Sequence, residues 1–175
     1  VTLLRHEEAL GYTGAVNAGL HNRADSAATL LLNSDTVLTR SAIRRMVAVL
    51  TRWPDVGIVG PLSNAASWQS VPLVKEGGKW SVNALPTGWD IEAIAGLVAS
   101  ESVSIGFPRV PLLNGFCLLI RDALFERIGL MDEEGFPRGY GEETDFCLRA
   151  SDAGFGLMVA LDAYVFHAKS KSYGS

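Results

Sequence analysis

The chain has 175 residues, of which 48% are hydrophobic, and its 15 basic and 19 acidic side chains give a net charge of −4. This length is enough for one domain with a substantial core, and no stretch approaches the roughly 20 consecutive apolar residues of a membrane span. The basic residues are spread along the sequence rather than clustered, which argues against a nucleic acid as the partner.

The first 61 residues alternate between strand and helix patterns, which predicts a right-handed, mostly parallel sheet of the α/β class. An uninterrupted apolar run at 29–33 is typical of a strand that is buried on both faces. Apolar residues three and four apart predict a helix that is capped by Thr39 or Ser41 and stops at Pro54. The predicted elements in this part are a strand at 1–5, a turn at 11–14, a helix at 15–23, a strand at 29–33, a helix from 41 to 53 and a strand at 56–60.

From 62 to 110 the regular pattern stops, and only one helix is predicted, at about 90–100. So long a connection with little regular structure is usually functional. Regular patterns then return, with a glycine, Gly129, as the expected stop of a short helix. The elements predicted after 110 are a strand at 112–121, helices at 122–128 and 142–153, and strands at 157–160 and 164–167.

A carboxylate follows the apolar strand at 29–33, in the turn Asn33-Ser34-Asp35-Thr36. Ligands of open α/β sheets bind outside the carboxyl ends of the strands. Magnesium and manganese prefer oxygen ligands, and one carboxylate together with substrate phosphates is enough to hold such an ion. A turn in which Asn33 and Asp35 merely cap the next segment is the alternative, and the turn by itself does not decide between the two.

A second acidic cluster, Glu142-Glu143-Thr144-Asp145, opens a helix after the turn Gly139-Tyr140-Gly141. The helix dipole stabilises ionised carboxylates at this end, which suits a general base. Ordinary acidic enrichment of a first helical turn is the more common explanation, and Asp145 is also spaced to pair with Arg149. The two glycines favour a site, because backbone without side chains lets a ligand approach closely.

His167 ends the last predicted strand and is followed by a polar tail with Lys169 and Lys171. A lone histidine on an apolar strand is usually structural, but lysines and hydroxyl groups directly after it are good partners for phosphate. Cys117 and Cys147 lie in apolar stretches without the spacing of a zinc or redox site, which predicts reduced, packed thiols. A protein with such thiols is expected in the cytoplasm, either free or peripheral at the inner membrane face.

Taken together, five motifs resemble the inverting glycosyltransferases of family 2, which have the fold called GT-A. The resemblance covers nearly the whole chain. The segments that carry it are Gly11–Leu20 beside the nucleotide, Leu31–Thr36 as a variant of the DxD metal motif, Gly115–Glu133, Gly141–Arg149 in place of the family's E-D-x-D-L-x-x-R, and Val165–His167 with its histidine.

The resemblance implies a metal-dependent enzyme that moves a sugar from a nucleotide-diphosphate donor to a carbohydrate or other hydroxyl acceptor, in cell-surface polysaccharide synthesis. Asp35 and His167 would hold Mn²⁺ or Mg²⁺. Glu143 stands at the position of the family's usual catalytic aspartate, and Glu142 is the neighbouring candidate. The donor-binding residues implied are Asn17, Asn33, Ser34, Lys169 and Lys171, and the acceptor-binding residues implied are Asn114, Gly115 and Asp145.

The front of the chain departs from the family pattern. The family begins with a βαβ unit that holds the nucleobase, and such a unit needs about 30 residues. We therefore expect a single partial domain: 1–61 as the rest of the nucleotide and metal half, 62–110 as an irregular insertion that shapes the acceptor pocket, and 111–175 as the catalytic half. The missing unit would leave an exposed sheet edge.

Two other classes of function stay open. One is a catalytically silent domain of the same fold that binds a glycan or a partner protein, for which the glutamate at 143 would be a symptom. The other is a nucleotidyltransferase of similar topology, which usually carries a glycine-rich phosphate loop that this sequence does not show. Binding that depends on metal and donor would favour the glycosyltransferase over the silent domain, whereas glycan binding that is indifferent to chelator would favour the silent domain.

Overall fold

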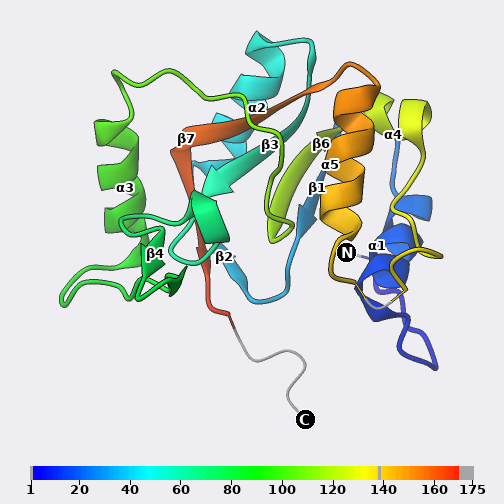
Figure 1. Cartoon of the computed structure of the whole chain (residues 1–175), viewed down its shortest axis with the longest axis horizontal. Helices are drawn as coiled ribbons and strands as arrows, with labels where there is room; N and C mark the ends of the chain where they lie inside the picture. The colour runs from blue at the N-terminus through cyan, green and yellow to red at the C-terminus, as the bar shows by residue number, and fades with distance from the viewer. Residues whose placement is uncertain (1, 138, 170–175) are drawn as a thin grey trace.

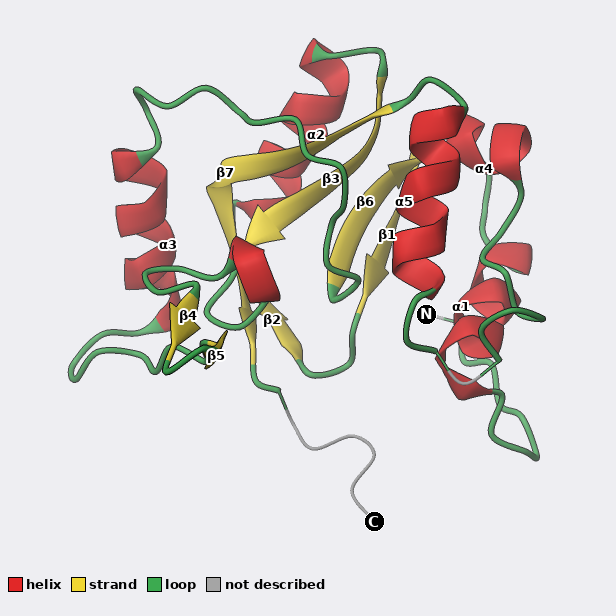
Figure 2. Cartoon of the chain, viewed as in Figure 1, coloured by secondary structure: helices red, strands yellow, loops and turns green. Residues whose placement is uncertain are grey.

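The computed structural model describes residues 2–137 and 139–169, and these form an α/β fold around one central sheet (Figures 1 and 2). The order of the five strands across this sheet is β1-β6-β3-β7-β2, and a small hairpin, β4-β5, lies apart from it. The bounds are α1 Gly11–His21, β1 Ala28–Leu32, β2 Thr36–Leu38, α2 Ala42–Arg52, β3 Val56–Leu62, a 3₁₀ turn Ser67–Gln69, β4 Lys75–Glu76, β5 Lys79–Trp80, α3 Ile91–Glu101, β6 Cys117–Arg121, α4 Asp122–Ile128, α5 Glu142–Asp152 and β7 Gly156–His167.

The pairing of the strands is mixed. β3 and β7 pair in parallel, whereas β6 runs antiparallel to both of its neighbours, β1 and β3. β1, β3 and β7 therefore share one direction, and β6 and β2 oppose it. The predicted α/β class is confirmed, but the insertion of β6 makes most of the neighbouring pairs antiparallel. β1 lies at an edge of the sheet with β6 as its one partner among the described strands.

The sheet has an apolar core on each face, because its side chains alternate with a period of two residues. Along β6, Leu118 and Ile120 pack into the core with α1, α4 and α5, and Cys117 and Leu119 pack into the core with α2. The thiols of both cysteines are free and buried, as predicted. Burial raises the pKa of Cys117 to about 12 and that of Cys147 to about 11, so both stay protonated.

Most of the predicted elements are present, with changed ends. The helices predicted at 90–100, 122–128 and 142–153 are α3, α4 and α5. The predicted strand at 1–5 is wrong, because residues 2–5 are irregular and exposed and pair with none of the described strands. The first helix starts at Gly11, in the predicted turn. The strand predicted at 112–121 is regular only from Cys117 on.

The last two predicted strands are one element, because β7 runs through the bend between Ala160 and Tyr164 without a break. Its first half pairs with β3, and its second half pairs with β2, a three-residue strand that the sequence did not predict. The bend is visible in Figure 1, where β7 first runs beside β3 and then turns downwards towards β2. Because β7 is long, its last residue, His167, lies at the end of the sheet where β1 also ends.

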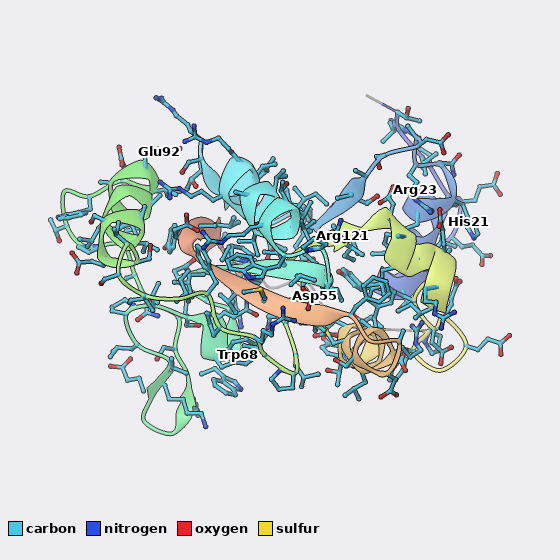
Figure 3. All side chains as sticks on the ribbon, turned by 90° about the horizontal axis from the view of Figure 1, so that it is seen from above. His21, Arg23, Asp55, Trp68, Glu92 and Arg121 are labelled. Carbon is cyan, nitrogen blue, oxygen red and sulfur yellow. The ribbon has the colours of Figure 1, made fainter. Side chains whose placement is uncertain are left out.

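The segment 62–110 is more ordered than expected, although its assignment as an acceptor insertion stays a prediction. Asn83 joins its two limbs, because its amide nitrogen donates to the carbonyl oxygens of Asn64 (3.0 Å) and Leu73 (2.9 Å). Asp90 caps α3 by accepting from the amide of Ala93 at 2.7 Å. Glu92, which Figure 3 labels on α3, accepts from the amide of Arg40, two residues before α2 begins, and so ties α3 to the start of α2.

Candidate active site

The turn after β1 lies at the edge of the sheet and is fixed by backbone contacts. The amide of Asn33 donates to the carbonyl of Phe116 (3.0 Å), and the hydroxyl of Thr36 donates to the carbonyl of Asn33 (2.7 Å). The next residues form β2, which pairs with the end of β7 so that Thr36 stands opposite His167. The amide of Ala168 then donates to the carbonyl of Asp35 at 2.8 Å. The short strand that the sequence did not predict thus brings Asp35 and His167 together.

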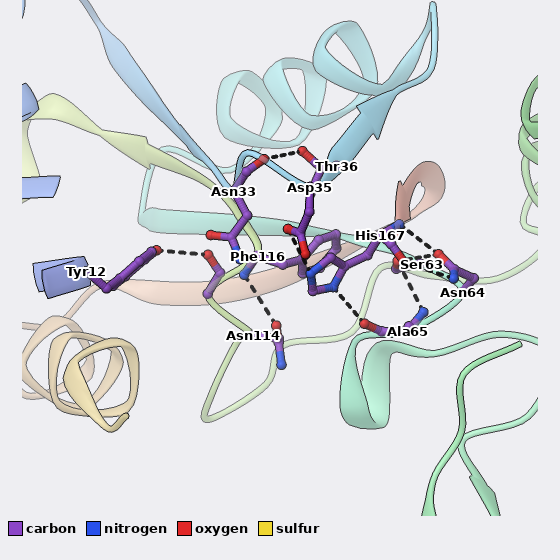
Figure 4. Close-up of polar contacts among 11 residues, drawn as sticks. Tyr12, Asn33, Asp35, Thr36, Ser63, Asn64, Ala65, Asn114, Phe116 and His167 are labelled. Atoms are coloured by element: carbon purple, nitrogen blue, oxygen red, sulfur yellow. Dashed lines mark hydrogen bonds and ion pairs between the residues drawn. The ribbon is translucent and has the colours of Figure 1, made fainter. Parts of the chain in front are cut away.

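Asp35 and His167 face each other at 3.2 Å, measured from Oδ1 to Nε2 (Figure 4). The other ring nitrogen, Nδ1, lies 2.8 Å from the carbonyl oxygen of Ala65 and must donate to it, because a carbonyl only accepts. A neutral His167 therefore points the lone pair of Nε2 at a carboxylate oxygen. Two lone pairs that face each other need a cation or a proton between them, so this pair fits a divalent metal.

In the part of the chain that the structure describes, no third His, Cys, Asp or Glu side chain joins these two to form a cluster that could hold a metal. Two protein ligands leave several positions of an octahedral ion open. Oxygens from a substrate phosphate are the usual partners of Mg²⁺ at such positions. The donor set thus suits an ion that is shared with a phosphorylated substrate.

Asn64 holds His167 in place and was not predicted as a site residue. Its carbonyl oxygen accepts from the His167 amide at 2.8 Å, and its amide nitrogen donates to the His167 carbonyl at 3.0 Å. The imidazole also stacks on Phe116, with ring centroids 5.2 Å apart and planes within 15°. Both residues are buried. The backbone and the ring of His167 are therefore fixed before any ligand arrives.

We expect Asn64→Ala to lower the free energy of unfolding by about 2–3 kcal/mol, because it removes two buried hydrogen bonds to the His167 backbone, leaves those backbone groups unpaired, and removes a longer bond from the Ser63 hydroxyl. Denaturant unfolding with an unchanged m value measures this loss. Asn22→Ala is the matched control, since Asn22 makes one exposed bond to the carbonyl of Ala18 and should cost well under about 1 kcal/mol. An equal loss of unfolding free energy in the two variants would contradict the role of Asn64 in holding His167.

The acidic pair Glu142 and Glu143 begins α5, as predicted, directly after Gly141, whose φ of 127° is one that side-chain-bearing residues rarely adopt. Glu143 packs against Gly115. A methyl group at that glycine would lie 3.3 Å from the Cβ atom of Glu143, so the close approach depends on glycine. Both carboxylates line a cavity of about 190 Å³ together with Tyr12, Asn33, Asn114 and Tyr140.

The two carboxylates have different surroundings. Glu142 is buried, and its Oε2 atom has no hydrogen-bond partner among the residues that the structure describes. Burial raises the pKa of Glu142, and the charge of Glu143 and its hydrogen bond to Glu142 add to this. Glu143 is half-buried at the cavity wall. Glu142 is thus the carboxyl that tends to keep a proton, and Glu143 is the one placed to act as a base.

Because the pKa of Glu142 is raised in the folded state, its protonated form stabilises the fold, and this contribution is lost as the pH rises through the raised value. We expect Glu142→Gln to melt at a higher temperature than the wild type at about pH 8, with the difference shrinking towards about pH 4. Thermal unfolding of both proteins across this range checks the prediction. A pH-independent difference would show that Glu142 does not titrate differently in the folded and unfolded states.

A larger cavity of about 810 Å³ lies between α1 and β1 and reaches the Asp35–His167 pair. The predicted donor residues Asn33, Ser34 and Lys169 line it, and Lys171 lies outside the described residues. Tyr12, Asn33 and Tyr140 line both this cavity and the one at the acidic pair. The two tyrosines were not predicted to belong to the site. The sequence feature that could have identified them is that each tyrosine follows a glycine in a motif, Gly11-Tyr12 and Gly139-Tyr140-Gly141.

Three predicted ligand residues have partners within the protein. Asn17 does not line the large cavity: its amide group bonds the backbone of Met131 through both its oxygen and its nitrogen, so its contact with a donor stays a prediction. Asp145 accepts from Arg149 at 2.7 Å. Asn114 lines the smaller cavity while its side-chain oxygen accepts from the amide of Phe116. These bonds shape the loops around the site.

The fold matches solved glycosyltransferases of the GT-A class. A crystal structure of GalNAc-T7 with UDP, GalNAc and Mn²⁺ superposes with a TM-score of 0.66 over 94% of this chain and 31% of that one, at 15% sequence identity. A mannosyltransferase from Pyrobaculum calidifontis in complex with GDP-Man and Mn²⁺ gives 0.61 over 98% of this chain and 40% of that one, at 18% identity. Identities this low establish the fold alone.

The sequence profile described as "Glycosyltransferase like family 2" matches residues 1–174, and the chain belongs to this family. It is 28% identical to the N-acetylglucosaminyl-diphospho-decaprenol L-rhamnosyltransferase of Mycobacterium tuberculosis over 99% of this chain, and it spans 61% of that relative's length. It is 27% identical to the low-salt glycan biosynthesis hexosyltransferase Agl10 of Haloferax volcanii, over 80% of this chain and 43% of the relative.

Proposed function

We propose that this protein is a metal-dependent, inverting glycosyltransferase that moves a sugar from a nucleotide-diphosphate donor to a hydroxyl group of an acceptor. The observation that carries the proposal is the adjacency of two unlike sites. The Asp35–His167 pair and the Glu142–Glu143 pair open onto cavities that share Tyr12, Asn33 and Tyr140 as walls. A leaving group and an attacking group can therefore be held on either side of one sugar.

In this reaction Glu143 takes the proton of the acceptor hydroxyl while the hydroxyl oxygen forms a bond to the anomeric carbon of the donor sugar. The bond from that carbon to the diphosphate breaks on the opposite face, which inverts the configuration. Asp35 and His167 would hold Mn²⁺ or Mg²⁺, which neutralises the charge of the departing diphosphate when it is bound. Lys169, exposed at the mouth of the larger cavity, adds a positive charge near the phosphates.

The relatives support glycan synthesis as the setting. Two curated relatives are named as a rhamnosyltransferase and a hexosyltransferase, and the structures of both structural neighbours contain a nucleotide or nucleotide sugar and Mn²⁺. The mycobacterial relative is named for an acceptor that is a sugar on a lipid diphosphate, so we include lipid-linked sugars among the acceptors to test. We place the reaction in the cytoplasm or at its membrane surface. Among the described residues, no helix is long and apolar enough to cross a membrane.

The test is transfer by the intact protein from a panel of nucleotide sugars, with Mn²⁺, with Mg²⁺ and with a chelator. We expect turnover with one donor, loss of turnover with chelator, and a product of inverted anomeric configuration by NMR. Glycan binding that is indifferent to chelator, without turnover of any donor, would instead assign the chain to the silent binding domain. A product that retains its configuration would contradict the inverting mechanism.

A further inference from the structure

Among the described residues, three other than glycine have a positive φ, and all three lie around the proposed site. They are Ser67 (52°), Tyr140 (69°) and Lys169 (49°). Lys169 lines the larger cavity, and Tyr140 lines both cavities. The hydroxyl of Ser67 accepts from the side-chain amide of Asn114, which lines the smaller cavity. Because this backbone conformation costs energy, folds keep it mainly where the placement of a side chain serves a function.

Tyr140 has the largest side chain of the three, and most of it faces solvent. Its exposed fraction is 81%. An aromatic ring usually gains free energy by leaving water, so the fold carries two costs at this position, a strained backbone and an exposed ring. Gly139 and Gly141 on either side also have positive φ, 88° and 127°. The turn is thus built to hold an aromatic side chain outside the core.

Aromatic neighbours hold this turn in place. A Cβ atom at Gly139 would lie 3.4 Å from the Cβ atom of Tyr12, in helix α1. A Cβ atom at Gly141 would lie 2.7 Å from the ring of Phe136, whose carbonyl oxygen accepts from the amide of Gly139 at 3.1 Å. The backbone on both sides of Tyr140 is therefore fixed, so the place of its ring is set before a ligand binds.

Tyr140 borders the space that a sugar must occupy during transfer. The diphosphate of the donor belongs beside the proposed metal pair and the attacking hydroxyl beside the proposed base, so the sugar lies where the two cavities meet. Tyr12, Asn33 and Tyr140 line both cavities. The hydroxyl of Tyr12 donates to the carbonyl of Gly115 at 3.2 Å, and Asn33 belongs to the backbone-bonded turn after β1. Tyr140 is the most exposed of the three.

We propose that Tyr140 binds the sugar of the donor by laying its ring against the C–H face of a pyranose, and that this contact selects which sugar is transferred. The proposal rests on the proposed function, since it names the part of the donor that this residue recognises. The hydrogens of the C–H bonds carry partial positive charge and meet the negative face of the aromatic ring. Axial hydroxyl groups on that face would prevent the contact, so the expected donor carries a hexose whose C–H bonds share one face.

The test compares two ligands of the intact protein by isothermal titration calorimetry in Mn²⁺, without acceptor. One is the nucleotide sugar that the donor panel identifies, and the other is the same nucleoside diphosphate without its sugar. Tyr140→Ala should weaken the nucleotide sugar about fivefold or more and leave the affinity for the nucleoside diphosphate unchanged. Tyr140→Phe keeps the ring and should bind both ligands like the wild type. Trp89→Ala is the matched control, because Trp89 is an exposed aromatic residue that lines neither cavity.

Tyr140→Asn supplies a second readout, because asparagine adopts a positive φ more readily than tyrosine. This variant should bind the nucleotide sugar as weakly as Tyr140→Ala. It should nevertheless unfold at no lower temperature than the wild type, since it relieves the strain of the turn. Thermal unfolding of both proteins without ligand measures this.

Three results would contradict the proposal. An unchanged affinity for the nucleotide sugar in Tyr140→Ala, while the wild type turns over that donor, would overturn it and leave the proposed function standing. An equal loss for both ligands in Tyr140→Ala, or a lower unfolding temperature in Tyr140→Asn, would assign Tyr140 to the structure of the turn instead. A panel in which no nucleotide sugar binds would refute the proposed function as well.

Discussion

Glu143→Gln is expected to lower kcat by about 100-fold or more while leaving the affinity for the nucleotide donor nearly unchanged. The amide keeps the size of the side chain and its packing on Gly115, but it cannot accept the acceptor's proton. A positioned general base contributes about 10²–10⁴-fold to such a reaction. Steady-state kinetics of the intact protein measures the fall in kcat, and a separate binding titration measures the affinity for the donor.

Two variants sharpen this test. Glu143→Asp keeps the base and restores the residue usual in the family, so it should retain far more activity than Glu143→Gln. Glu134→Gln removes an exposed carboxylate of the preceding loop and should leave kcat unchanged. Full loss in Glu142→Gln with normal turnover in Glu143→Gln would exchange the roles of the two carboxylates, because the neighbour would then be the base.

Asp35→Asn is expected to weaken Mn²⁺ binding by about 100-fold or more and to lower turnover by about 10²–10³-fold. The amide fills the same space, but it takes away the negative charge that faces Nε2 of His167 at 3.2 Å. Titration of Mn²⁺ by electron paramagnetic resonance, in the presence of the nucleotide diphosphate, measures the first effect. His167→Ala should resemble Asp35→Asn, and the double variant should lose little more than either one.

Asp55→Asn is the control for that series. Asp55 forms an exposed ion pair with Arg109, and its substitution should change neither Mn²⁺ affinity nor kcat. Unchanged Mn²⁺ affinity in Asp35→Asn would contradict the assignment of this pair as the metal site. Turnover that persists in chelator while Asp35→Asn is inactive would point instead to an ion pair between Asp35 and a protonated His167.

The sequence was sufficient to predict those helices that their own residues specify through caps and apolar spacing. Helix α3 was predictable because Asp90 supplies a cap and Ile91, Ile94, Ala95 and Val98 repeat with helical spacing. Helix α5 was predictable from its acidic first turn. The expected strand at 1–5 failed for the opposite reason: an apolar run forms a strand only with a partner, and residues 2–5 have none among the described residues.

What the sequence could not show depends on contacts between distant residues. β2 has three residues, which is too short for a pattern, and its pairing with the end of β7 joins positions about 130 apart in the chain. In the sequence Asn64 is one polar residue among several after a strand, yet its side chain is hydrogen-bonded to the backbone of His167, 103 positions away. The predicted roles of Asp35, His167 and Glu143 came from resemblance, and their spatial adjacency came only with the fold.

The contacts of Asn64 and Ala65 with His167 limit where a segment of this protein can be replaced by the matching segment of a relative. We propose that the segment that begins at 62 shapes the acceptor pocket, which makes it the unit to exchange when a new acceptor is wanted. Its first residues, Ser63 to Ala66, are buried and fix the tautomer and the position of the histidine. A chimera joined at 62 would import a foreign support for the metal-facing histidine along with the new acceptor surface. A junction after Ala66 leaves that support native, so we expect such a chimera to change acceptor preference without changing use of the donor.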